Sequence, residues 1–401
     1  MKEKKEKDRN IWIKKWKELH PVQKILDSEA LECLKDSRAR KIIGMDIFLI
    51  LLLFLVLIIV NITDSSVKTS GKTKENADTK QTSESQDTDA GENTEERTAP
   101  VTITVSAAGD CTLGTDEFFS WEDSLPAKYE ETGDFSYFFQ NVNPVFSKDD
   151  VTIVNFEGTL TDSEYRADKQ FAFKADKSYV NILTEGSVEA VNLANNHSKD
   201  YGEESYTDTI AALDEAGIAN FGYDRTAMME IKGVKVGLVG TYVLAEGIGV
   251  KDSMVTNIQS LKAQGAQLVI VSFHWGEEKA AYPGEVQKEL AHAAVDQGAD
   301  LVIGHHPHVL QGIEKYNGRN IVYSLGNFCF GGNSYPSDMD TIIFQQTFTF
   351  EGGEQKEDDV TNIIPCRISS ADGYNNYQPT PAEGEEADRI LQKLEERSFG
   401  I

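Results

Sequence analysis

Apolar residues gather in one long run near the N-terminus and in several shorter runs farther along the chain. The long run extends from Ile42 to Ile62 and is apolar on every side between Ile47 and Val60, whereas a helix buried in a soluble core carries a polar stripe. About 21 residues, each rising about 1.5 Å, are enough to cross a hydrocarbon layer of roughly 30 Å. The run therefore predicts a single transmembrane helix at residues 42–62.

Charges on either side of this run predict its orientation. Arg38, Arg40 and Lys41 precede it, and Asp64 is the first charge after it. The positive-inside rule then places the N-terminus in the cytoplasm and the C-terminal part outside the cell. The run is long, begins about forty residues into the chain and lacks a small-x-small cleavage site, so it is expected to be an uncleaved anchor in the cell membrane rather than a signal peptide.

Two polar segments flank the predicted span. Residues 63–99 are almost entirely Ser, Thr, Asp, Glu, Lys, Gln, Asn and Gly, which cannot bury enough apolar surface to repay the entropy of ordering. They are expected to form a disordered extracytoplasmic linker. Residues 1–41 form the predicted cytoplasmic segment, where Ile11, Ile13 and Trp16 fit either a helix on the anionic inner leaflet or a helix that docks a protein.

From residue 100 onward, short β-branched runs alternate with helical stretches, which is typical of an α/β domain. The domain is predicted at 100–370, followed by a C-terminal tail at 371–401. Helices are expected at Glu203–Ala216 and Glu285–Gln297, each followed by a glycine, and a closing antiparallel hairpin at Thr341–Ser369. The expected strands are Ile103–Ala107, Val151–Asn155, Ala190–Leu193, Val234–Val239, Leu268–Phe273, Leu301–Ile303 and Ile321–Ser324.

Charge and cysteine content exclude two classes of function. The formal net charge of −27 over 401 residues would repel a phosphate backbone, so nucleic acid is not an expected partner. The four cysteines are widely spaced and form no CxxC pair, so neither a disulfide framework nor a zinc-thiolate site is indicated. These cysteines are Cys33, Cys111, Cys329 and Cys366.

Polar residues able to bind metal follow the predicted strands, and the carboxyl ends of strands are where ligands collect in open α/β sheets. Five of the seven histidines lie in these segments, and only His20 and His292 lie elsewhere. Imidazole and carboxylate ligands without thiols indicate a divalent ion such as Mn, Fe or Zn. The residues that follow strands are Asp110, Glu157, Asn195, Asn196, His197, His274, His305, His306 and His308.

The segment GHHPH is the sharpest local signal. His306 and His308 are two residues apart, and on an extended segment with Pro307 fixing the backbone they would offer two ring nitrogens to one ion. The alternative is a solvated histidine turn without a ligand.

Other polar residues have both a functional and a structural interpretation. Asn196 can ligate through its carbonyl, His197 can donate a proton and Asp200 can orient a neighbour, or NNHSKD can be an Asx-turn that caps the next helix. Trp275 is either a platform for a sugar or peptide or a packing residue. The remaining candidates are Glu278, as a carboxylate orienting His274 or an exposed loop residue, and Lys174, as an anion-binding or solvated lysine.

Six motifs in order, AAGDCTLG, NFEGTL, NLANNHSKDYG, SFHWGEE, GHHPHVLQG and YSLGNF, resemble those of the CapA family. That family is associated with bacterial capsule and poly-gamma-glutamate synthesis and belongs with the calcineurin-like metallophosphatases. The resemblance implies a four-layer αββα sandwich of metallophosphatase type with a metal centre at one rim, holding one or two ions. By motif it implies metal ligands at Asp110, Glu157, Asn196, His274, His306 and His308, with His197 as the acid.

The motifs depart from the superfamily pattern at two positions. The first motif is usually Asp-x-His, but Thr112 stands two residues after Asp110, and Glu157 stands where an aspartate is usual. Without this imidazole, the centre would hold one ion only, or would need His305 as a substitute ligand. Asn155, Asn195 and Asn327 are further candidates for supporting the ligands or contacting substrate, although Asn327 in YSLGNF also fits a tight strand-to-loop turn.

The expected chemistry is metal-assisted hydrolysis or transfer, with His197 protonating the departing group. The resemblance implies a role in handling an anionic surface polymer such as poly-gamma-glutamate, at the membrane and together with polymer-synthase membrane subunits. The rival interpretation is a non-catalytic module that binds polymer or partner subunits and keeps a metal for structure.

Overall fold

The computed structural model describes residues 99–357 and 360–401. Within these ranges no helix combines the length and the apolar composition that a membrane crossing requires. The predicted span at 42–62, the cytoplasmic segment and the linker up to residue 98 lie outside the described residues.

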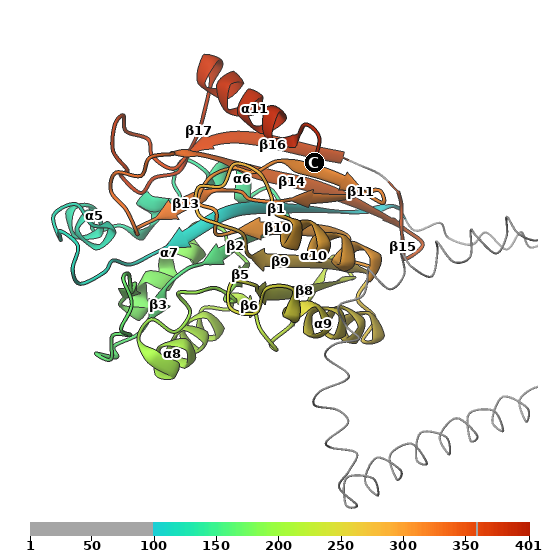
Figure 1. Ribbon diagram of the computed structural model, residues 1–401, viewed down its shortest axis with the longest axis horizontal. Helices are drawn as coiled ribbons and strands as arrows, with labels where there is room; N and C mark the ends of the chain where they lie inside the picture. Colours follow the sequence, from blue (N-terminus) through green and yellow to red (C-terminus); the bar gives the residue numbers. More distant parts are fainter. Residues whose placement is uncertain (1–98, 358–359) are drawn as a thin grey trace, which may run out of the picture. The chain divides into compact units, whose positions relative to one another are not determined.

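A nine-stranded sheet combines strands from the N-terminal and C-terminal parts of the described domain (Figure 1). Four parallel strands, β1, β2, β5 and β6, are extended by antiparallel strands on the far side of β1, while β13 pairs parallel with β1. Its members are β17 (Thr380–Pro381), β16 (Val360–Arg367), β14 (Asp340–Glu351), β1 (Val101–Thr112), β2 (Val151–Phe156), β5 (Ala190–Asn192), β6 (Ala219–Phe221), β13 (Asn327–Phe330) and β15 (Glu354–Gln355).

A second, six-stranded sheet has parallel strands at its centre and an antiparallel strand at each edge. In order it contains β11 (Ile313–Tyr316), β12 (Arg319–Val322), β10 (Leu301–His305), β9 (Leu268–His274), β8 (Val234–Tyr242) and β7 (Ala227–Ile231). A short pair, β3 (Thr159–Leu160) and β4 (Lys174–Ala175), lies apart from both sheets.

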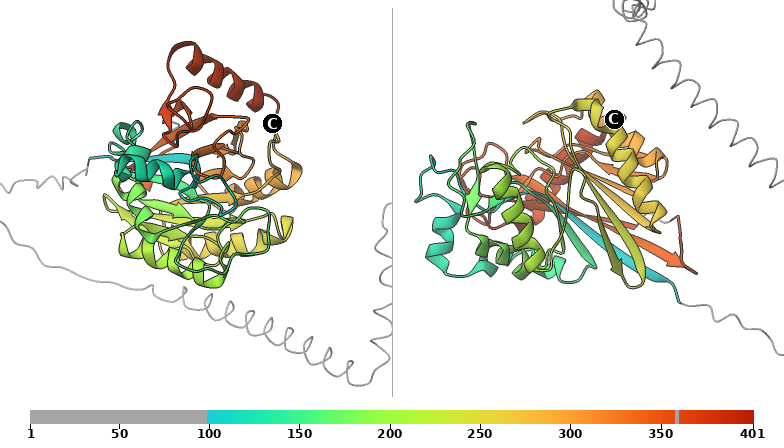
Figure 2. Two further views of the ribbon diagram at one scale, coloured as in Figure 1. Left: turned by 90° about the vertical axis from the view of Figure 1, so that its left-hand side faces the viewer. Right: turned by 90° about the horizontal axis from the view of Figure 1, so that it is seen from below.

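Three apolar cores separate the layers. One lies between the two sheets and contains Ile103 and Ile153 from the first sheet and Ile270 and Ile303 from the second. The second core packs the other face of the first sheet against α6, α7 and α8, and the third packs the other face of the second sheet against α9 and α10. The layers can be followed from two further sides in Figure 2.

The helices connect or cover these strands. They are α5 (Leu125–Thr132), α6 (Asn143–Phe146), α7 (Val180–Glu185), α8 (Gly202–Glu215), α9 (Lys251–Ala263), α10 (Glu285–Asp296) and α11 (Gly384–Ser398), with 3-10 turns η1 (Phe135–Phe138), η2 (Lys177–Tyr179) and η3 (Gly247–Val250). Gly217 and Gly298, which follow α8 and α10 closely, have φ values of +75° and +100°. Glycine tolerates these angles, so the two helices end where the sequence predicts.

The α/β class, the seven predicted strands and the closing hairpin are confirmed. In the hairpin, β14 pairs antiparallel with β16, and Gly352 and Gly353 follow β14 with positive φ. Strand β1 is longer than expected and includes Asp110, which the sequence placed after the strand.

Residues 371–401 are an integral part of the domain rather than a tail. Ile390 and Leu394 of α11 are buried in the core between the sheets. Arg389 holds both oxygens of Asp340 at 2.6 and 2.7 Å, and Ser398 Oγ accepts a hydrogen bond from Ile313 N. The predicted boundary at residue 370 is therefore wrong, because apolar residues beyond it complete the core.

Candidate metal centre

Alternation along the strands brings the candidate metal ligands to one place. Side chains two residues apart point to the same face of a sheet. Ile153 faces the core between the sheets, so Asn155 at the end of β2 faces the same side. By the same rule His274 points to the side of Ile270 in β9, and His305 points to the side of Ile303 in β10. The carboxyl ends of the two sheets thus present polar side chains toward each other at the end of a shared apolar core.

A bulge in β1 brings Asp110 to this face. Ala107 pairs with Ile153 and Asp110 pairs with Asn155, so β1 has one more residue than β2 between these points. An extra residue shifts the alternation of the strand. Asp110 therefore lies beside Asn155, whose Nδ2 donates a hydrogen bond of 2.8 Å to Asp110 Oδ1. The sequence signal for this shift is Gly109, where a Cβ atom would lie 2.0 Å from the Gly326 oxygen.

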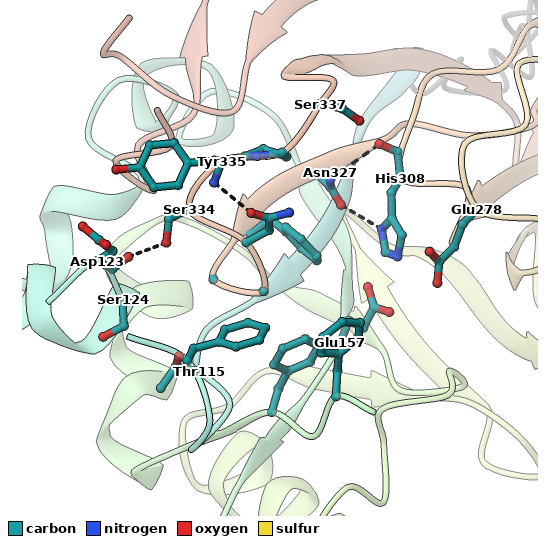
Figure 3. Close-up of a pocket in the computed structure, with 18 of the residues that line it drawn as sticks. Thr115, Asp123, Ser124, Glu157, Glu278, His308, Asn327, Ser334, Tyr335 and Ser337 are labelled. Atoms are coloured by element: carbon teal, nitrogen blue, oxygen red, sulfur yellow. Dashed lines mark hydrogen bonds between the residues drawn. The ribbon is translucent and has the colours of Figure 1, made fainter. Parts of the chain in front are cut away.

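Carboxylates and imidazoles converge at this point. Asp110 is fully buried, with its oxygens 3.5 Å from His305 Nδ1 and 3.2 Å from His308 Nδ1. Glu157, His306 and His308 each offer one ligand atom, and these atoms lie within 4.8 Å of one another. Figure 3 shows Glu157 and His308 on the same wall of an adjoining pocket.

The loop after β10 does not have the extended backbone that the sequence analysis expected. His306 and His308 have φ values of +94° and +57°, a region that non-glycine residues seldom enter. The ring centroids lie 5.5 Å apart. Each such residue costs of the order of 1–3 kcal/mol, and residues of this kind cluster at functional sites. A simple solvated turn is excluded, because His306 is buried and the Lys279 N–H donates to the Pro307 oxygen over 2.7 Å.

The donor atoms of the site fit a cation. Within the described residues, Glu157 Oε2, both ring nitrogens of His305 and Nδ1 of His306 are buried without a hydrogen-bond partner. Leaving a buried polar group unpaired typically costs about 1–3 kcal/mol, so four such atoms in one place require an explanation. A divalent ion that prefers nitrogen and oxygen ligands provides one.

His274 and Asn196 come together at the rim of the same site. Nε2 of His274 lies 2.7 Å from Oδ1 of Asn196. An imidazole nitrogen and an amide oxygen are both donor types that a divalent ion binds, so this pair would contribute to holding the proposed ion. The Nδ1 of His274 lies 3.2 Å from Asn155 Nδ2, which fixes the orientation of the ring.

Electrostatics in the site reflect burial and mutual contact. Burial raises the pKa of Glu157 to about 8 and lowers the pKa of His306 to about 4. Burial opposes protonation of His308, but the carboxylates of Glu157 and Asp110 raise its pKa to about 9. Burial acts against ionisation of Asp110, yet the nearby imidazoles of His305 and His308 hold its pKa well below the usual range. The pKa of His274 is lowered, mainly by burial.

His197 lies beside the ligands and contacts a carboxylate with its other nitrogen. Its Nδ1 is 2.7 Å from Asp200 Oδ2, and its Nε2 is 3.8 Å from Glu157 Oε1. The capping alternative is wrong, because α8 begins after Tyr201 without a side-chain cap. An Asx-turn is present, since Asn195 Oδ1 accepts from the His197 N–H over 3.0 Å, but it aims His197 rather than capping the helix. Burial lowers the pKa of His197.

Two supporting residues escaped the sequence analysis. Lys169 Nζ donates to Asp200 Oδ1 and to the Asn196 carbonyl, both at 2.7 Å, and it comes from a loop with no local motif to signal it. Asn192 Nδ2 donates to Asn155 Oδ1 over 3.0 Å. A polar residue on the inward face of β5 was the signal that would have revealed Asn192.

The structure places the remaining candidates as follows. Asn327 Oδ1 lies 2.8 Å from His308 Nδ1 and supports the ring, and Asn195 Nδ2 donates to the Phe156 oxygen. The platform alternative for Trp275 is wrong, because the side chain is fully buried and stacked on Phe273 in the outer core.

Two charged candidates are placed differently from the functional expectation. Lys174 donates to the Ser163 oxygen and lies over the Tyr201 ring, so its charge is directed away from the centre. Glu278 is exposed and lines the pocket without a hydrogen bond to His274 among the described residues, since Asn155 and Asn196 occupy both nitrogens of that ring.

A family model described as bacterial capsule synthesis protein PGA_cap matches residues 104–332, more than half of the chain. The chain belongs to this family. The resemblance carried by the six motifs is therefore confirmed. The matched range contains every residue placed at the candidate centre.

Individual relatives in the capsule family are moderately similar. The PGA biosynthesis protein CapA of Bacillus subtilis (strain 168) is 36% identical over 214 residues, covering 48% of this chain and 56% of that protein. The capsule biosynthesis protein CapA of Bacillus anthracis is 34% identical over 258 residues, covering 58% of this chain and 61% of that protein. The matches thus span less than two thirds of either relative.

Among solved structures, a calcineurin-like phosphoesterase of Bacillus subtilis is 17% identical, with a TM-score of 0.44. The match covers 74% of this chain and 97% of the phosphoesterase.

Proposed function

We propose that this protein is a membrane-anchored, extracytoplasmic component of capsule or poly-gamma-glutamate biosynthesis or export, and that its metal centre performs hydrolysis or group transfer. The observation that carries the catalytic part is the cluster of Glu157, His306 and His308, with ligand atoms within 4.8 Å of one another. Membership of the capsule family supports the biological role. The three cores around two sheets support a four-layer αββα sandwich of metallophosphatase type.

Six side chains are the proposed ligands of the ion. The ligands would be Asp110, Glu157, Asn196, His274, His306 and His308, supported by Asn155 and Asn327. A divalent ion held there would polarise the bond under attack and provide a nucleophile near neutral pH.

Proton transfer is assigned to His197. Asp200 accepts from Nδ1, so Nε2 is directed toward the side of the ring where Glu157 lies. The negative charge of Asp200 stabilises the protonated ring, which lets Nε2 give a proton to the leaving group. Lys169 holds Asp200 in place through its 2.7 Å contact.

Thr112 supports a second candidate function. It stands where the metallophosphatase motif has a histidine, and its Oγ1 is buried without a hydrogen bond among the described residues. A missing ligand weakens one of two metal positions, which favours a binding or assembly subunit that keeps one ion for structure. The proposed partners in either case are an anionic surface polymer and polymer-synthase subunits in the membrane.

Elemental analysis and hydrolysis assays on one preparation test the two functions. The metal-loaded chain is supplied with phosphoesters, peptides and gamma-glutamyl polymer. The catalytic function predicts a stoichiometric transition metal and turnover of at least one class, abolished by the paired His306→Ala and His308→Ala substitutions. Stoichiometric metal without turnover of any class would leave the structural role.

The proposed location has its own test. Protease added to intact, wall-stripped cells should cut within residues 63–98 and release a soluble fragment, because the charges around 42–62 favour a domain outside the cell. Protection of the domain until the membrane is lysed would reverse the orientation.

A further inference from the structure

A cavity of about 720 Å³ opens directly from the metal centre. Glu157, His197 and His308 line it, together with residues 118–120, 123–124 and 331–338. Figure 3 shows Glu157 and His308 on one side of the pocket and Asp123 and Ser124 on the other. Pockets of 300–1,000 Å³ or so usually accommodate a small ligand or a few linked units of a polymer. A ligand bound in this cavity would therefore lie next to Glu157, His197 and His308.

Aromatic rings line two sides of the cavity. Phe171 and Phe173 lie nearly parallel, with ring centroids 6.4 Å apart, and the Phe173 ring is 4.6 Å from that of His197. On the other side, the Phe330 ring is 5.2 Å from that of His308. These two aromatic walls converge on the metal centre.

Several rings of this pocket face solvent. Phe118 is 74% exposed and Tyr335 is 63% exposed, although both belong to a strongly acidic protein. Exposed large apolar groups gathered at one place usually mark a binding surface. The part of the pocket around Phe118 and Tyr335 is thus suited to bind a ligand with apolar faces.

Hydroxyl and amide groups alternate with these rings. Thr115 Oγ1 is buried without a hydrogen bond among the described residues, and no described residue hydrogen-bonds the hydroxyls of Ser120 and Ser337. Asn333 also lines the cavity, and its Nδ2 has no hydrogen bond to the described part of the chain. These groups are available to pair with polar groups of a ligand.

The charges in the pocket do not suit a stretch of polyanion. Asp123, Glu278 and Asp338 line it beside the buried Glu157, and Asp338 is paired with Lys393. Lys279 is the single lysine or arginine among the described lining residues, and His197 and His308 are the other basic groups. Consecutive carboxylates of a polymer would meet like charges at short range in a partly desolvated space. An acyl chain suits it no better, because Val309 and Pro336 are the only residues with wholly aliphatic side chains among the described lining residues.

We propose that this pocket binds a short stretch of uncharged sugar rings. The aromatic walls would stack on the apolar C–H faces of the rings, and the free hydroxyl and amide groups would pair with sugar hydroxyls. This inference rests on the proposed function in one respect, since it names the substrate class presented to the metal centre. An anionic polymer would then meet the protein outside the pocket or reach it by one end group.

The test measures binding by isothermal titration calorimetry on the full chain in phosphatidylcholine nanodiscs, because a maltoside detergent would itself offer sugar rings. The probes are the β-linked tetramers of N-acetylglucosamine and of glucose, a gamma-linked glutamate octamer and hexyl phosphate. At least one sugar tetramer should bind tightest. Phe171→Ala and Tyr335→Ala should each weaken it about tenfold, equivalent to about 1.4 kcal/mol. Phe399→Ala, which removes a ring 88% exposed outside the pocket, should leave affinity unchanged.

The outcomes separate this inference from the proposed function. Tighter binding of the glutamate octamer or of hexyl phosphate, or sugar binding that survives both pocket substitutions, would overturn the sugar site. Failure of both sugar tetramers to bind would do the same, even if the chain hydrolyses another substrate. Sugar binding that depends on Phe171 and Tyr335, in a chain without any hydrolytic activity, would support the pocket and remove the catalytic function.

Discussion

His197 and Asp200 form a buried pair in which Nδ1 of the imidazole lies 2.7 Å from the carboxylate. A nitrogen engaged in this way holds the ring in one orientation, and the opposite nitrogen then points toward Glu157. The distance from Nε2 to Glu157 Oε1 is 3.8 Å, the same as that from His274 Nε2, so proton transfer is assigned to His197 on its contact with Asp200, which His274 lacks.

His197→Gln should retain the metal and lose activity by about 10²- to 10⁴-fold, the usual contribution of a general acid. Metal content, thermal midpoint and hydrolysis or polymer production are measured on the same preparation. Loss of metal would make His197 a ligand, and unchanged activity would remove it from the mechanism. Asp200→Asn tests the pair, because it keeps the shape and removes the charge that stabilises the protonated ring.

Lys169→Met should lower both the metal affinity of the centre and the stability of the domain, although Lys169 is not a candidate ligand. The substitution leaves the buried Asp200 carboxylate without its 2.7 Å cation and the Asn196 carbonyl without its donor, at a cost of about 1–3 kcal/mol in the free energy of unfolding. Lys169→Arg should restore most of the metal affinity. Lys199→Met is the matched control, since Lys199 pairs with Glu203 on the surface. Equal effects of the two methionine substitutions in urea unfolding would contradict the positioning role.

The paired His306→Ala and His308→Ala substitutions should abolish bound metal and leave a folded domain. Both residues have a strained backbone with positive φ, and substitution by alanine does not increase this strain, so the domain should still fold. Removing the two rings removes two of the three clustered candidate ligands. Metal is measured by elemental analysis and folding by circular dichroism. His292→Ala is the control, because His292 pairs with Glu314 away from the centre. Unchanged metal content in the double variant would show that the ligand assignment is wrong.

Metal-free protein should lose stability as pH rises from about 6.5 to about 9. Folding raises the pKa of Glu157 from 4.5 to about 8 and that of His308 from 6.5 to about 9, so the folded state binds more protons in this window. Stability falls with pH wherever the folded state binds the extra protons. Folding lowers the pKa of His306 from 6.5 to about 4. This group therefore makes stability rise with pH, but only below pH 6.5, outside the window considered.

The same two groups predict that metal binding releases protons. Ligands must be deprotonated, so affinity should rise with pH over the same window, and calorimetry in buffers of different ionisation enthalpy should detect the released protons. Glu157→Gln should reduce both the proton release and the loss of metal-free stability with pH. A wild-type stability profile that is flat between 6.5 and 9 would contradict the assigned pKa shifts.

The sequence predicted the positions of the strands well, because a buried strand needs a run of β-branched residues and a polar residue at its end. It also predicted that the candidate ligands come together, since parallel strands end at the same edge of a sheet. It did not predict β13, a strand as short as Asn327–Phe330 that pairs with β1, because its residues carry no alternation to distinguish it from a turn.

Local sequence determined the chemistry of this protein, namely which residues can bind a metal and that they follow strands. Tertiary structure decided what surrounds them. The bulge that turns Asp110 inward, the burial of Trp275 and the contact of Lys169 with Asp200 each depend on a segment distant in the chain. The role of 371–401 was decided in the same way, because whether α11 is a tail or part of the core depends on an apolar surface supplied by both sheets. Side-chain alternation is a property of a strand, but the partner that each side chain meets is a property of the packing.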